Sequence, residues 1–80
     1  MKTDTNEIVA NGTRNMLGLR LMFEREKLGL TQGELAQCVG VHRVSQSNYE
    51  RGVTSPDVYY LAKADEIGID IYYVLTGKIK

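Results

Sequence analysis

The sequence contains 80 residues, with 10 basic and 10 acidic side chains and one cysteine. A chain of this length forms one small domain, and its balanced charge excludes a protein that is basic over its whole surface. One cysteine forms no internal disulfide, and no apolar run reaches the roughly 20 residues of a membrane span. We therefore expect a cytoplasmic protein that makes no use of a membrane.

The chain opens with a polar segment, residues 1–13, which predicts a mobile arm with at most one helical turn. Thr13 is then expected to cap a first helix, which Gly29 ends. Apolar side chains at intervals of three and four residues support this helix. Its inner face is predicted to consist of Leu17, Leu21, Arg25 and Leu28. A second apolar group on another face consists of Leu19, Met22 and Phe23.

The second helix follows directly. Thr31 and Glu34 have the spacing of a capping box, and Gly40 marks the helix end. A third helix is expected over residues 42–51. Its row of uncharged polar residues contains weak helix formers, so tertiary packing must hold it in place.

The last two helices are short. Ser55 is expected to cap the fourth, with Pro56 in its first position. Its inner face is predicted to consist of Tyr60, Leu61, Ala64 and Ile67. Asp70 caps a fifth helix that ends at Gly77. No segment alternates like a strand, so the predicted class is all-α, with five short helices.

The link between the second and third helices is the most informative part of the sequence. Ala36 is small enough for another helix to approach closely, and Gly40 accepts the positive φ of a sharp turn. Val41 can fill the angle between the helices, and Tyr49 points back to the core. This is the layout of a helix-turn-helix.

These residues give the chain a specific resemblance. The string LTQGELAQCVGVHRVSQSNYERG, followed by a Ser-Pro pair, resembles the lambda-repressor/Cro-like (XRE-type) helix-turn-helix family of phage and bacterial regulators. The matching residues are Leu30, Thr31, Gln32, Glu34, Leu35, Ala36, Gly40, Val41, Glu50, Gly52 and Pro56. The resemblance implies a lambda-repressor-like DNA-binding domain over 14–77, with the helix-turn-helix at about 31–51 and a tail at 78–80.

Two residues depart from the family pattern. His42 stands where the family usually has a serine or threonine cap, and Gln46 stands where it usually has an apolar residue. An unpaired buried amide costs a few kcal/mol. Gln46 must therefore find a buried hydrogen-bond partner or turn to the surface.

The resemblance also implies how the third helix acts. In a helix-turn-helix this helix enters the major groove of double-stranded DNA by its N-terminal end. The base-reading positions map onto Arg43, Val44, Ser47 and Asn48, with Arg43 as the main contact. Contacts to the DNA backbone are expected from Gln32, His42, Ser45, Arg51 and Thr54. Glu50 resembles a family glutamate that pairs with an arginine of the first helix, here Arg25; the alternative is a solvated glutamate.

Further partners are expected. Relatives pair through the region of the fourth and fifth helices, which implies a homodimer; the candidate contacts are Tyr59, Ile71 and Tyr72. The group Leu19, Met22 and Phe23 has two interpretations. It packs against Ile8 and Val9 or the last helix, or it forms a protein–protein surface.

The leading hypothesis is a sequence-specific, dimeric DNA-binding regulator, a phage-type repressor of its operator. The alternative is an antitoxin, or another interaction module, that binds a protein partner and regulates its own operator. A third interpretation is the DNA-binding domain of a longer repressor. Cys38 and His42 lack further metal ligands, and the serines lack a base, so we expect no enzyme, metal or cofactor.

Overall fold

The computed structural model describes residues 5–79, with side chains from Thr13 to Ile79, and this part of the chain folds into five α-helices without a strand. Their bounds are α1 Thr5–Lys27, α2 Gln32–Val39, α3 Arg43–Glu50, α4 Val58–Ile67 and α5 Ile71–Thr76. The predicted all-α class is confirmed. The helices are short except for α1, which has 23 residues.

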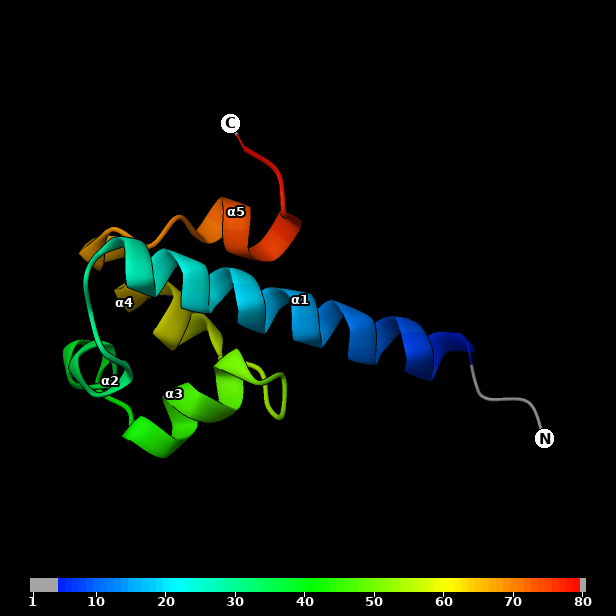
Figure 1. Ribbon diagram of the computed structural model, residues 1–80, viewed down its shortest axis with the longest axis horizontal. Helices are drawn as coiled ribbons and strands as arrows, with labels where there is room; N and C mark the ends of the chain where they lie inside the picture. Colours follow the sequence, from blue (N-terminus) through cyan, green and yellow to red (C-terminus); the bar gives the residue numbers. More distant parts are fainter. Residues whose placement is uncertain (1–4, 80) are drawn as a thin grey trace.

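The first helix starts earlier than predicted. It begins at Thr5, so the expected start at Thr13 is wrong, and Thr13 lies exposed within the helix. Residues 5–12 contain no proline, and their polar sequence has no apolar periodicity that would distinguish a helix from an arm. The first turns of α1 extend beyond the other helices (Figure 1).

The core lies where α1 crosses the other helices. α1 contacts α3 on one side and α5 on the other, while α2 contacts α3 and α4 (Figure 1). The buried apolar cluster consists of Leu21, Leu35, Tyr60, Ala64, Ile69 and Val74. Leu28 was expected on the inner face of α1, but it is exposed near the end of this helix.

Side-chain caps set the helix starts. The predicted capping box of α2 is confirmed: the Glu34 N–H donates to Thr31 Oγ1 at 3.1 Å, and the Thr31 N–H donates to Glu34 Oε1 at 2.8 Å. Asp70 caps α5 as predicted. The predicted cap Ser55 is wrong, because the N-cap of α4 is Asp57, whose carboxylate accepts the Tyr60 N–H at 2.9 Å. Ser55 and Pro56 stay in the loop before it.

Two polar side chains of α1 fix α5 in place. Arg20 Nε donates to the Val74 carbonyl at 2.8 Å, and the Asp70 N–H donates to Glu24 Oε1 at 3.0 Å. Glu24 is buried, and its other oxygen accepts Lys27 Nζ at 3.0 Å. α1 therefore acts as the scaffold on which α5 and, on the opposite side, α3 are placed.

Candidate nucleic-acid interface

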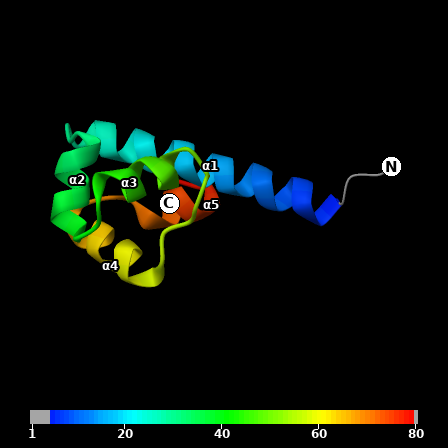
Figure 2. The same ribbon diagram turned by 90° about the horizontal axis from the view of Figure 1, so that it is seen from below.

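The α2–α3 connection has the geometry of a tight turn. Gly40 has a φ of 82°, in the left-handed region that favours glycine. The N–H groups of Gly40 and Val41 both donate to the Ala36 carbonyl, at 2.9 and 3.0 Å. Figure 2 shows α2 and α3 meeting at an angle on one side of the molecule.

α1 approaches the end of α3 very closely at Gly18. A Cβ atom at this position would lie within 3 Å of the Tyr49 and Glu50 carbonyl oxygens, which are backbone atoms that cannot move aside cheaply. Only glycine allows this spacing. Gly18 was not predicted as a contact position from the sequence, although an isolated glycine within a helical pattern is the signal of such a contact.

The buried side of α3 carries a polar network. Gln46 is fully buried; its Nε2 donates to Glu50 Oε2 at 2.7 Å, and its Oε1 accepts the Tyr60 hydroxyl at 2.5 Å. Of the two possibilities for Gln46, the buried partner is therefore the one observed. The role of the Tyr60 hydroxyl was not predicted from the sequence. No buried side-chain polar atom in the described part of the chain lacks a hydrogen-bond partner.

Arg25 and Glu50, the expected ion pair, meet at the centre of this network. Arg25 Nε lies 2.7 Å from Glu50 Oε2, and a second guanidinium nitrogen lies 3.0 Å from Oε1, so the pair is bidentate. Arg25 also donates to the Leu30 carbonyl at 2.7 Å. Both side chains are almost fully buried. Removing one partner of such a pair leaves an uncompensated buried charge.

The network changes the pKa values of its members. Burial alone would raise the pKa of Glu50, but hydrogen bonds from Arg25, Gln46 and Gln32 outweigh it, and the net effect is a lowered pKa. The hydrogen bond to Glu50 raises the pKa of Arg25. Burial raises the pKa of Tyr60, so its hydroxyl stays protonated and can donate to Gln46.

Gln32, an expected phosphate contact, also reaches the network. Its Nε2 donates to Glu50 Oε1 at 3.2 Å from the first turn of α2. An amide nitrogen carries two N–H groups, so one remains for another acceptor. Gln32 is only half-buried, which leaves that side of the amide open to solvent.

The N-terminal end of α3 and the side away from the core are accessible to solvent. Arg43 is exposed, Val44 is 68% exposed, and Ser47 and Asn48 are half-buried. Among the described side chains, from Thr13 to Ile79, none forms a hydrogen bond with that of Arg43, Ser47 or Asn48. The stem of Arg43 lies over α2, with its Cδ atom 3.8 Å from the position of a Cβ atom at Gly33. The four expected base-reading positions therefore leave their polar groups available.

The chain was compared with known proteins. It matches the helix-turn-helix family model over residues 21–69, more than half of its length. No curated protein matches it. The protein belongs to the Cro/C1-type (XRE) helix-turn-helix family. This helix-turn-helix protein is thus a member of a family of DNA-binding transcriptional regulators, which are generally not enzymes.

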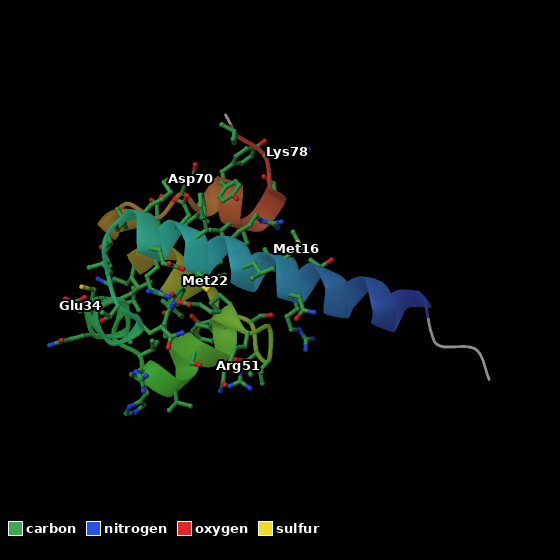
Figure 3. All side chains as sticks on the ribbon, in the orientation of Figure 1. Met16, Met22, Glu34, Arg51, Asp70 and Lys78 are labelled. Carbon is green, nitrogen blue, oxygen red and sulfur yellow. The ribbon has the colours of Figure 1, made fainter. Side chains whose placement is uncertain are left out.

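The expected backbone-contacting residues of this family member lie around α3. His42 is its N-cap, without a side-chain capping bond, and is exposed; Arg51 and Thr54 are exposed beyond its C-terminal end. The Val53 and Thr54 N–H groups donate to the Asn48 carbonyl, at 2.9 and 3.4 Å, and hold this loop against α3. Figure 3 labels Arg51 at the end of α3. Ser45, within α3, is half-buried.

The apolar group of α1 is divided between two sides. Phe23 contacts Tyr73 of α5 edge to face, with 6.4 Å between ring centroids, yet remains 54% exposed. Leu19 is 51% exposed, and Met22 lies on the side toward α3 (Figure 3). The last helix is thus a neighbour of Phe23, as one interpretation expected, while the side chains of Ile8 and Val9 lie outside the described part.

The dimer candidates of this helix-turn-helix protein differ in exposure. Tyr59 is 80% exposed and Tyr72 is 40% exposed, whereas Ile71 is half-buried against the core. Tyr72 therefore combines an accessible surface with contacts inside the domain.

No group of three or more potential metal ligands occurs among the described residues, and Cys38 is an exposed free thiol. No helix in the described part is long and apolar enough to cross a bilayer.

Proposed function

We propose that the protein is a sequence-specific regulator, a phage-type repressor, that binds double-stranded operator DNA as a homodimer and reads the major groove with α3. The observation that carries this proposal is the two-sided construction of α3. One side is held by the ion pair with α1, the other side presents Val44 to solvent, and the first turn presents Arg43. Because the ion pair fixes the position of α3 in the domain, the accessible side chains of this helix can be aligned with base edges.

The first turn of α3 supplies the expected specificity. Arg43 and Val44 lie at the N-terminal end, which enters the groove in this motif. Arginine donates two hydrogen bonds to guanine, and valine can contact the thymine methyl group. Ser47 and Asn48, one turn later, extend the contacts along the groove.

The phosphate contacts would flank this helix. His42 and Arg51 lie at its two ends, and Gln32 lies at the N-terminus of α2, where backbone N–H groups favour an anion. Few cations are present on this side of each chain, so the salt dependence should be shallow, with a slope of about −0.9 per phosphate neutralised.

A homodimer follows from the small number of base pairs that one helix can read. Dimers of this motif place two recognition helices about 34 Å apart on successive half-sites. Tyr59 and Tyr72 supply exposed aromatic surface for the contact. Sedimentation equilibrium, with and without a palindromic duplex, measures the stoichiometry; a single chain bound per site would contradict the dimer.

Selection of binding sites from random duplexes tests the sequence specificity. We expect an enriched site, and no enrichment would refute the regulator. Arg43→Ala should then lose about 1–3 kcal/mol of discrimination at one base pair. Gln32→Ala should instead weaken all duplexes alike. Lys63→Ala, which removes an exposed charge from α4, is the control and should change neither property.

The alternative function is an antitoxin or interaction module. The half-exposed side chains of Leu19 and Phe23 favour it, because adjacent exposed apolar residues mark protein–protein surfaces. Co-purification with the product of a neighbouring gene, abolished by Leu19→Ser, would support it. Enrichment of DNA alone, with no protein captured, would oppose it.

A further inference from the structure

Gln46 is a polar residue in a place that this family usually fills with an apolar one. It sits in the middle of α3, is fully buried, and makes short hydrogen bonds on both ends of its amide. Through Tyr60 it joins α3 to α4, and through Glu50 it joins the ion pair that holds α3 to α1. The Tyr60 ring also packs edge to face on Tyr49, with centroids 5.0 Å apart.

The direction of each bond in this chain is determined. The ionised Glu50 carboxylate can only accept, so the Gln46 nitrogen must point toward it. The Gln46 oxygen must then face Tyr60, whose hydroxyl donates. The amide cannot be flipped without placing an oxygen against a carboxylate. Gln46 therefore has a single orientation, set from two sides.

This orientation constrains how α3 can rotate about its own axis. Arg43 lies one turn before Gln46, at the exposed N-terminal end of α3, and the half-buried Ser47 follows Gln46 directly. Side-chain ends lie about 6 Å from a helix axis, so a rotation of about 10° moves them by about 1 Å. Hydrogen bonds tolerate only a few tenths of an ångström in length. An apolar side chain at position 46 would resist such a rotation less, because its contacts are not directional.

We propose that Gln46 and Tyr60 are positioning residues that set the rotation of the recognition helix and thereby the base specificity of Arg43 and Ser47. This inference rests on the proposed function, since it presupposes that α3 reads DNA. It adds that the sequence preference depends on two buried residues that touch no base. The phosphate contacts at His42 and Arg51 need no alignment with a base edge, so a small rotation should change them without changing the sequence preference.

The test compares Gln46→Leu, Tyr60→Phe and the double variant with the wild-type chain. Gln46→Leu leaves the Tyr60 hydroxyl without its acceptor and takes one donor from Glu50, and Tyr60→Phe leaves the Gln46 oxygen without its donor. Each single change should therefore lower the thermal midpoint. The double change removes the Gln46 amide and the Tyr60 hydroxyl together, so it should recover the part of the loss that comes from the unpaired group. Glu50 then keeps Arg25 and Gln32 as donors, and the directional contact is gone. Gln37→Leu, at an exposed glutamine of α2, and Tyr73→Phe, in α5, are the matched controls.

The decisive measurement is the ratio of dissociation constants for the selected site and for an unrelated duplex, at one salt concentration. We expect the folded double variant to lose about tenfold in this ratio, comparable to one base contact, with an unchanged salt slope. The controls should keep the wild-type ratio. A wild-type ratio in a double variant that folds normally would overturn the proposal, and so would an equal loss of affinity for both duplexes.

The same experiment separates the two levels of inference. If the wild-type chain selects no site, the proposed function fails, and the positioning role fails with it. If the wild-type chain selects a site and the double variant prefers it equally, only the positioning role fails.

Discussion

The two sides of α3 are built on opposite principles. On the inner side, Gln46 and Glu50 are buried and bound by residues from α1, α2 and α4. On the outer side, Arg43 and Val44 are exposed and contact solvent. The polar groups of the inner side form hydrogen bonds within the domain and fix the position of α3. The polar side chains of the outer side form no such bonds in the described part of the chain and can contact another molecule. A helix of weak helix formers can therefore have a fixed position in the domain while its accessible side chains remain free to contact DNA.

Among the changes on the inner side of α3, Arg25→Leu should lower the unfolding free energy most. It leaves the buried Glu50 carboxylate without its cation, which should cost about 3–5 kcal/mol of unfolding free energy. Urea denaturation followed by circular dichroism measures the change. Arg43→Leu, the matched change on the outer side, should stay within about 0.5 kcal/mol of wild type. Similar losses for both variants would abolish the distinction between the two sides.

Gly18→Ala tests the close approach of α1 to the inner side. The added methyl group meets the Tyr49 and Glu50 carbonyl oxygens, so α1 and α3 must separate. We expect a loss of about 1–3 kcal/mol, typical of overpacking. The unfolding free energy of this variant, measured in urea, should therefore lie between those of Arg25→Leu and the wild-type chain. A neutral or stabilising change would show that α1 is not pressed against α3.

Acid should weaken the inner side through Glu50. Its pKa is lowered in the folded state, so the stabilisation is fully present above the ordinary value of 4.5 and is lost as the pH falls through the folded pKa. Unfolding free energies between pH 3 and pH 7 should therefore decline at the acid end. Glu50→Gln should flatten that decline.

The control for this titration is Glu34→Gln, because the pKa of Glu34 is also lowered, by its capping bonds to Thr31. Glu34 is exposed, so its contribution should be smaller and reduced by salt. If Glu50→Gln kept the full acid dependence, other carboxylates would have to account for it.

Gly33→Ala is expected to have the smallest effect and the opposite sign. A methyl group here would make ordinary contacts with Arg43 Cδ at 3.8 Å and Thr31 Oγ1 at 4.0 Å. Alanine favours a helix over glycine by about 0.5–1 kcal/mol, so α2 should be stabilised. A rise in the urea midpoint would confirm this, whereas a fall would mean that the stem of Arg43 is held tightly after all.

Local features of the fold could be predicted from the sequence because their causes are local. The capping box at Thr31, the turn at Gly40 and the cap at Asp70 each depend on residues within four positions. The fourth helix shows the limit of this reasoning. Ser55 and Asp57 are both good caps, and only the folded chain selects Asp57.

Long-range contacts were harder to predict. The Arg25–Glu50 pair was expected only through the family resemblance. The partner of Gln46 lies 14 residues away on α4, and Tyr60 was assigned to an apolar face. Nothing in the local pattern tells a buried tyrosine with a bonded hydroxyl from one that only packs. Gly18 was missed for the same reason, because its constraint comes from α3.

The hydrogen bond between Gln46 and Tyr60 also limits which substitutions this domain can accumulate during evolution. Losing the glutamine first leaves a hydroxyl stranded in the interior, and losing the tyrosine hydroxyl first strands an amide oxygen. Each single step is costly, whereas the paired replacement leaves neither group unpaired and costs only the Gln46 bond to Glu50, which Arg25 and Gln32 still contact. We therefore expect positions 46 and 60 to vary together among descendants of this chain, while positions 43 and 44 drift independently of them.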